Sequence, residues 1–418
     1  MGYTLAEKVL ARVSGGAPVR AGDEVMAKPD FVIVYDFPGY TDVIFRQMKQ
    51  DFGIDRVAEP DRFAIFIDHM VPTATPKEEE LHIQTREWCA HQGVPLYERR
   101  GIGHQVSAEL GYATPGAFAV HFDGHISQLG AFGTLAIGLR RNILEAFVRE
   151  RVSLKVPHTT RINLHGALQP GVMARDVFHH IVRVLGPSAC RFQVMEVGGP
   201  ALAGISLEGR QTICGLAMFT GAVTAVINPD ALSLAYTAPR NRVQVPIETS
   251  DPDAHYAAVH DIDVTGLEPI IVLPPNPANT RNLSDHIGTA VHSGYLGSCA
   301  SGRLEELRIA AQILKGRRVK DGFSLHVIPT SQDIMAKAAA EGIITTLVEA
   351  GAFTSSPSCD YCFGRIATMS PGQRAVSTGT LNVPGRMGSP DSEIFLMNAA
   401  AVAAAAIEGR IADPRKYL

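Results

Sequence analysis

The stretch Ser293–Val319, SGYLGSCASGRLEELRIAAQILKGRRV, places a cysteine between glycines directly before a predicted amphipathic helix. The apolar side of this helix is expected to carry Leu304, Leu307, Ala310, Ala311 and Leu314, which recur at helical spacing. The opposite side is expected to carry Glu305, Glu306, Arg308 and Gln312. A helix N-terminus favours nearby negative charge, so Cys299 is expected to ionise readily.

Two further cysteines, Cys359 and Cys362, form a C-x-x-C motif in a turn rich in glycine, serine and proline. Taken alone, a single cysteine is more often a buried packing residue, and C-x-x-C fits a zinc half-site, a redox pair or cluster ligands. Three cysteines fall short of the four protein ligands of a structural zinc site. An iron–sulfur cluster uses thiolates, and with only three of them one iron keeps an open coordination position. Such an iron can act as a Lewis acid toward a hydroxyl or carboxylate group.

The cysteine-containing stretch resembles the GSC-x-x-GR-x-E-x-L segment of 3-isopropylmalate dehydratase large subunits, within the aconitase superfamily. The resemblance extends over nearly the whole chain. Its other segments are GYTLAEKVLARVSG at the start, Ile67–Thr73, Thr114–Gly138, Thr212–Ala222 and the alanine-rich Asn398–Gly409. The order and spacing of these segments make a chance match improbable.

The composition of the chain limits the class of protein, the number of domains and the cellular compartment that we expect. A chain of 418 residues with 46% hydrophobic and 19% charged residues suits a globular enzyme of two to four domains. A net charge of −4 does not suggest nucleic-acid binding. The N-terminus resembles no signal peptide, and no apolar run reaches 18 residues, so we expect neither membrane insertion nor export. Six unevenly spaced cysteines argue against a disulfide scaffold and favour the cytoplasm, and Cys89, Cys190 and Cys214 are expected to be buried bystanders.

Strand-like and helix-like segments alternate along the chain, which predicts an α/β fold. The clearest expected elements are a helix at Thr4–Val13 capped by Thr4, strands at Phe31–Tyr35, Ala64–Ile67, Ala117–Phe122 and Arg161–Leu164, and helices at Pro76–Gln92, Ala174–Leu185 and Thr212–Val226. LPPNPAN, at Leu273–Asn279, has the composition of a linker. The resemblance implies three α/β/α domains around a cluster, which we place at residues 1–158, 159–268 and 269–418, with the third domain carrying the cluster cysteines.

Two predicted strands run into an aspartate followed by a histidine, at Asp68-His69 and Asp123-Gly124-His125. A strand-end turn is the simplest interpretation, but ligands of α/β proteins also bind at this edge, and a His–carboxylate pair can transfer protons. The resemblance implies that Asp68, His69, Asp123 and His125 are catalytic and that Cys299, Cys359 and Cys362 hold a [4Fe–4S] cluster. It also implies substrate contacts from His104, Ser301 and Arg386, with Arg386 gripping a carboxylate.

Several positions depart from the family pattern. Gly124 replaces a serine, Gly215 an asparagine, Phe219 a glutamate and Leu381 an arginine, and the usual Cys-Thr-Asn is Cys299-Ala300-Ser301. These losses predict a remodelled, more apolar pocket. A substrate with fewer carboxylates than citrate or isopropylmalate follows as a hypothesis.

The family adds a mobile fourth domain, which isopropylmalate-type enzymes carry on a separate small subunit. This chain ends soon after its alanine-rich helix, so we expect a small swivel-domain partner that brings the serine base. The expected function is a hydro-lyase large subunit acting on a small hydroxy acid. The alternatives are a cluster-dependent isomerase or lyase with altered chemistry, and a non-catalytic binding protein of the same fold.

Overall fold

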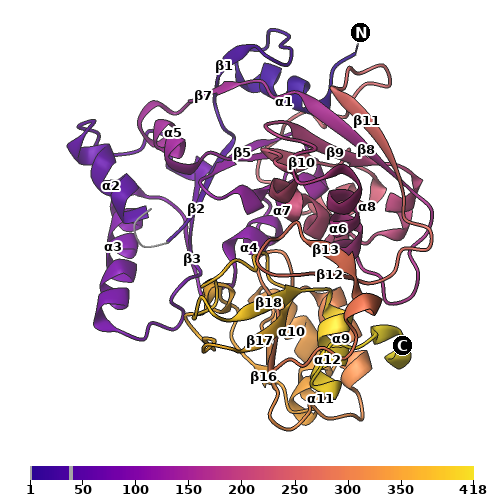
Figure 1. Cartoon of the computed structure of the whole chain (residues 1–418). Helices are drawn as coiled ribbons and strands as arrows, with labels where there is room; N and C mark the ends of the chain where they lie inside the picture. Colours follow the sequence, from indigo (N-terminus) through magenta and orange to yellow (C-terminus); the bar gives the residue numbers. More distant parts are fainter. Residues whose placement is uncertain (1, 37–40) are drawn as a thin grey trace.

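The computed structural model describes residues 2–36 and 41–418, and these form three regions in sequence order (Figure 1). Each region contains one of three main β-sheets. A separate antiparallel pair joins β1 (Glu24–Ala27) to β7 (Val152–Lys155). Helix α1 (Leu5–Val13) starts after Thr4, which forms the predicted capping box with Glu7.

The first main sheet has the strand order β4-β3-β2-β5-β6, and all of its described pairs are parallel. Its strands are β2 (Phe31–Tyr35), β3 (Phe63–Ile67), β4 (Leu96–Glu98), β5 (Phe118–His121) and β6 (Leu135–Gly138). The helices of this region are α2 (Thr41–Gln50), α3 (Pro76–Gln92), α4 (Gly103–Glu109) and α5 (Leu144–Arg149). Every residue of β2 and β3 is buried, which explains their unbroken apolar sequences FVIVY and FAIFI.

The second sheet has the parallel order β10-β9-β8-β11. Its strands are β8 (Thr159–His165), β9 (Val194–Gly198), β10 (Thr224–Val226) and β11 (Ala258–Asp263), with helices α6 (Ala174–Leu185), α7 (Leu207–Leu216) and α8 (Ala231–Thr237). The helix predicted over Thr212–Val226 is therefore wrong in its second half. The chain leaves the α-helix after Leu216, Gly221 turns it with φ +80°, and the β-branched segment that follows pairs with β9.

The third sheet has seven strands in the order β13-β12-β18-β17-β14-β15-β16, and β12 is antiparallel to both of its neighbours. Its strands are β12 (Ile270–Val272), β13 (Thr280–Asn282), β14 (Ser293–Leu296), β15 (Ser324–Val327), β16 (Phe353–Thr354), β17 (Arg374–Ser377) and β18 (Glu393–Leu396). Its helices are α9 (Leu304–Leu314), α10 (Gln332–Ala340), α11 (Ile343–Glu349) and α12 (Ala399–Glu408). The proline-rich segment Leu273–Asn279 joins β12 to β13, so it is a hairpin loop within this sheet and no linker between domains.

Two apolar cores hold these layers together. One runs continuously through the first and second sheets, and the other surrounds the third sheet. In the second core all of Ala399–Ala406 is buried against α9 and β14, as the predicted tightly packed helix requires. The α/β class is confirmed, whereas the domain limits at 158/159 and 268/269 stay a prediction. In the described part of the chain, each helix is too short or too polar to cross a membrane.

Candidate active site

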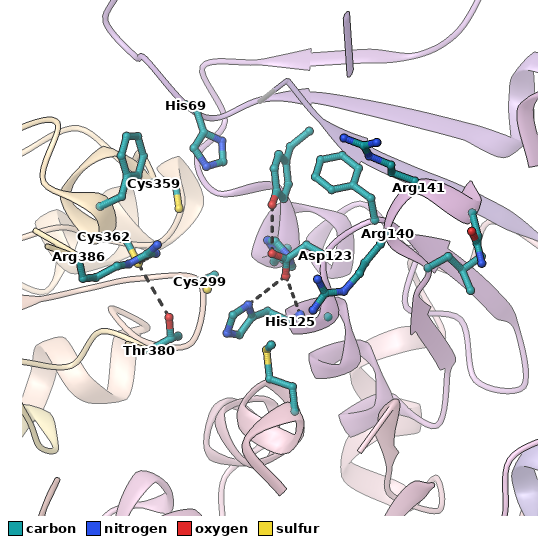
Figure 2. A pocket seen from close by; sticks show the side chains of 18 residues that line it. His69, Asp123, His125, Arg140, Arg141, Cys299, Cys359, Cys362, Thr380 and Arg386 are labelled. Atoms are coloured by element: carbon teal, nitrogen blue, oxygen red, sulfur yellow. Dashed lines mark hydrogen bonds and ion pairs between the residues drawn. The ribbon is translucent and has the colours of Figure 1, made fainter. Parts of the chain in front are cut away.

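A cavity of about 670 Å³ collects side chains from all three regions (Figure 2). Eight of the ten predicted site residues line it, namely His69, His104, Asp123, His125, Cys299, Cys359, Cys362 and Arg386. The aspartate–histidine segments follow β3 and β5, which both pair with β2, so they reach the same carboxyl edge of the first sheet. The cysteines and Arg386 come from loops of the third region.

Cys299 lies in the loop between β14 and α9, and this loop requires its glycines. Gly297 has φ +132° and Gly302 has φ +80°; a Cβ on either would lie 2.1 or 2.4 Å from the carbonyl oxygen of Ile328. The helix itself begins only at Leu304, so Cys299 is not at its first turn. Burial raises the pKa of the Cys299 thiol well above its usual range, which corrects the expected helix-assisted ionisation.

The side chain of Arg303 holds the Cys299 loop in position. Its guanidinium is fully buried and donates to the carbonyl oxygen of Cys299 at 3.3 Å. It also donates to the side-chain oxygens of Gln105, Thr212 and Gln128. One buried arginine thus connects the cysteine loop by hydrogen bonds to helices of the first and second regions.

Cys359 caps the N-terminus of a short 3₁₀-helix, Asp360–Phe363, that follows β16, and Cys362 lies within this helix. A hydrogen bond with Cys359 and the charge of Arg386 lower the pKa of Cys362 well below its usual range. The Arg386 Nη2 atom donates to Cys362 Sγ at 3.1 Å, while its buried Nε has no partner among the described residues. The three other cysteines are buried, as predicted, and burial raises the pKa of Cys89 to about 12.

In the first aspartate–histidine pair, Asp68 and His69, the His69 side chain lines the cavity. His69 Nδ1 lies 2.6 Å from Asp68 Oδ1, and Asp68 Oδ2 accepts a hydrogen bond from the Gly103 N–H at 2.7 Å. Burial opposes protonation of His69, but the Asp68 carboxylate outweighs it and the pKa of His69 is raised. Asp68 is outside the described cavity lining and contacts His69 Nδ1, so its predicted catalytic role stays a prediction.

The second pair is centred on Asp123. Its Oδ1 lies 3.0 Å from His125 Nδ1 and 3.4 Å from His104 Nε2, and its Oδ2 accepts a hydrogen bond from the Tyr35 hydroxyl. Burial alone would raise the Asp123 pKa, but the two histidines hold it well below its usual range. The Asp123 charge likewise raises the pKa of His125 against the effect of burial. His125 Nε2 is buried without a hydrogen-bond partner in the described structure, so it is available to a ligand.

Ser301 and Glu306 do not lie where the sequence placed them. Ser301 is fully buried outside the cavity lining, and its hydroxyl donates to Glu306 Oε1 at 2.9 Å. Glu306, expected on the solvent side of the helix, is only 4% exposed and also accepts from the Arg303 N–H. The hydrogen bond of Ser301 with Glu306 helps to hold the Cys299 loop, and a substrate contact from Ser301 stays a prediction.

Other lining residues were missed from the sequence, above all Arg140 and Arg141. Two consecutive arginines soon after the end of β6 were the sequence signal that could have predicted their place at the cavity. Phe219 and Leu381, on which the more apolar pocket was predicted, are not among the described residues that line the cavity. Gly124 does line it, and a Cβ there would meet only Met218 at 3.6 Å, so the missing serine leaves open space.

This combination of thiols and paired histidines at the edges of α/β sheets defines an α/β enzyme with a cysteine-containing cavity. The sequence matches the profile of the aconitase family (aconitate hydratase) over residues 7–290 and 286–409, and the chain belongs to this family.

Individual relatives agree with that assignment. The chain is 36% identical to 3-isopropylmalate dehydratase large subunit 1 of Methanopyrus kandleri, with 100% of both chains covered. It is 33% identical to a probable methanogen homoaconitase large subunit of Methanothermobacter thermautotrophicus, over 99% of this chain and 97% of that protein. A structural match to the crystal structure of Thermococcus kodakaraensis aconitase X (holo-form) covers 91% of this chain and 89% of that chain, at 12% sequence identity and a TM-score of 0.49. The predicted family and hydro-lyase class are confirmed.

Proposed function

We propose that this chain is the large catalytic subunit of a hydro-lyase that removes water from, or adds it to, a small hydroxy acid. The observation that carries the proposal is the meeting of three cysteines and two aspartate–histidine pairs in one cavity. Relatives named 3-isopropylmalate dehydratase and homoaconitase large subunits support the reaction class.

The donor set fits a [4Fe–4S] cluster held by Cys299, Cys359 and Cys362. Sulfurs around one tetrahedral zinc ion lie about 3.8 Å apart. Among the described residues, the one group whose ligand atoms all lie within 4.8 Å is Asp36, Asp68 and His69, so the three thiols are spread more widely than one ion requires. The Arg386 contact to Cys362 Sγ also suits a thiolate ligand. When bound, such a cluster supplies an iron with an open position, which acts as a Lewis acid toward a hydroxyl group.

The chain's own residues would then handle protons and orientation. His69 and His125 each engage an aspartate through Nδ1, and at His125 the buried Nε2 has no hydrogen-bond partner among the described residues, so it can exchange a proton. In the close-up, His125 lies between the cysteines and the arginine doublet (Figure 2). We infer that His125 delivers or accepts the proton of the substrate hydroxyl and that His69 and His104 orient it. Arg386 Nε is a free donor for a substrate carboxylate.

The function is tested with the protein purified anaerobically and supplied with a small subunit from the same source. "Large subunit" in the relatives' names supports such a partner. The isolated chain is expected to be inactive on a panel of hydroxy acids, and the small subunit is expected to restore turnover, since the α-proton needs a base that we assign to the partner. Full activity of the 418-residue chain alone would contradict the division between subunits. Ligand binding without turnover by the complete complex would favour the non-catalytic alternative.

Substitution of Arg386 separates substrate binding from chemistry. Arg386→Ala is expected to raise KM by roughly 10- to 100-fold with a smaller change in kcat, because a charge-assisted contact to the carboxylate is lost in both ground and transition states. Steady-state kinetics with iron analysis checks this. Arg374→Ala is the control, because Arg374 is exposed and paired with Glu393 in the described structure. A fall in iron content without a KM change would show that Arg386 serves Cys362 instead.

A further inference from the structure

Arg140 and Arg141 lie at the cavity on the side away from the cysteines (Figure 2). Both are exposed, and neither guanidinium has a hydrogen bond or ion pair within the described ranges 2–36 and 41–418. Two adjacent cationic side chains without an anionic partner, at the rim of a substrate-sized cavity, can bind an incoming anion.

The backbone holds this doublet in a defined place. The Leu139 N–H donates to His121 O at 2.6 Å and the Arg140 N–H donates to Phe122 O at 3.2 Å. These acceptors, His121 and Phe122, directly precede Asp123. The backbone that positions the two arginines is therefore hydrogen-bonded to the backbone that positions the second aspartate–histidine pair. Arg140 has φ +51°, a backbone conformation that side chains other than glycine adopt at a cost.

The other charged groups that line the cavity do not neutralise Arg140 and Arg141, so the two arginines can bind an anionic ligand. Asp123 is the one carboxylate among its described lining residues, and it is already held by His125, His104 and Tyr35. Arg386, by contrast, lies beside Cys362, so the two cationic positions flank the Asp123–His125 pair in the close-up (Figure 2). A substrate with its hydroxyl near His125 could present one anionic group to each side.

We propose that Arg140 and Arg141 are specificity-determining residues that bind a second anionic group, a carboxylate or a phosphate, at the end of the hydroxy acid distant from Arg386. This inference rests on the proposed function. It is an alternative to the hypothesis of a substrate with fewer carboxylates, because Phe219 and Leu381 lie outside the described cavity lining while two arginines lie within it.

The test compares three 3-hydroxy acids that differ at the far end: 3-hydroxypentanoate with an ethyl group, 3-hydroxyglutarate with a carboxylate and 3-hydroxy-4-phosphooxybutanoate with a phosphate. Each has an α-proton and a hydroxyl on the neighbouring carbon, as the proposed elimination requires. The variant Arg140→Gln/Arg141→Gln keeps polar side chains and removes both charges. Arg149→Gln is the matched control, since Arg149 is exposed on nearby α5 and outside the lining. Kinetics of the cluster-loaded two-subunit enzyme should show a loss of roughly 10- to 100-fold in kcat/KM for the preferred acid with a second anionic group. 3-Hydroxypentanoate should be little affected, and the acid that loses more identifies the terminal group.

Calorimetric titration of the same ligands into the full chain separates this inference from the proposed function. If no acid is turned over but an acid with a second anionic group binds and loses affinity in the double variant only, the arginine site stands and the hydro-lyase proposal falls. Equal losses for 3-hydroxypentanoate and the two acids with a second anionic group, or wild-type affinity for those two acids in the double variant, would overturn the inference. Thermal melting of each variant excludes misfolding as the cause.

Discussion

Cys299→Ser is expected to remove the cluster and abolish turnover. Anaerobically purified wild-type chain should carry about four irons and four sulfides, with one iron labile to oxygen. Hydroxyl is a much poorer iron ligand than thiolate, and Gly297, Gly302 and Arg303 hold residue 299 in its loop, so the serine hydroxyl would take the position of the lost thiolate. Iron and sulfide analysis with EPR spectroscopy should show near-complete loss of the cluster, and activity should fall below detection.

Cys190→Ser is the matched control for this experiment. Cys190 is buried outside the cavity, and its thiol has a side-chain hydrogen bond with Thr220 that a serine hydroxyl can keep. This variant should retain full iron content. A wild type that instead contains one equivalent of zinc and no iron after anaerobic reconstitution would contradict the cluster. That result would indicate that the cysteines bind zinc.

The sequence located the site well where function coincides with the end of a strand. The fully apolar FVIVY and FAIFI can only be strands buried on both faces, which fixes a parallel sheet covered by helices. A charged residue directly after such a strand must then lie at its carboxyl edge. Asp68 directly follows β3, and Asp123 comes two residues after the end of the equally buried strand β5, so the neighbouring histidines lie at the same edge.

The sequence was less informative where three-dimensional context overrides a local pattern. Glu306 has helical spacing for a solvent face, but Ser301 and the Arg303 backbone bind it inside the protein. No periodicity can reveal those partners. The arginines of the rim were overlooked for a different reason: Arg140 reaches the cavity through a left-handed backbone conformation that the sequence does not suggest at a non-glycine residue.

His125→Ala is expected to lower kcat by roughly 10²- to 10⁴-fold, the range typical of losing a general acid or base, with a much smaller change in KM. The reason lies in the geometry: Asp123 holds Nδ1 at 3.0 Å, so the unpartnered Nε2 is the atom that can exchange a proton with substrate. Asp123→Asn should also lower kcat, since an amide stabilises the protonated imidazole far less than a carboxylate. Steady-state kinetics of the two-subunit enzyme measures both effects.

His165→Ala is the control because it breaks a similar pair without touching the cavity. His165 Nε2 lies 2.9 Å from Asp261 Oδ1, and its side chain is 45% exposed. Its kcat should equal that of the wild type. Iron content must be measured for each variant, because His125 is close enough to Cys362 for their charges to interact. If His125→Ala keeps both its iron and its kcat, the proton must be carried elsewhere, and His69, held by Asp68 in the same way, becomes the residue to replace.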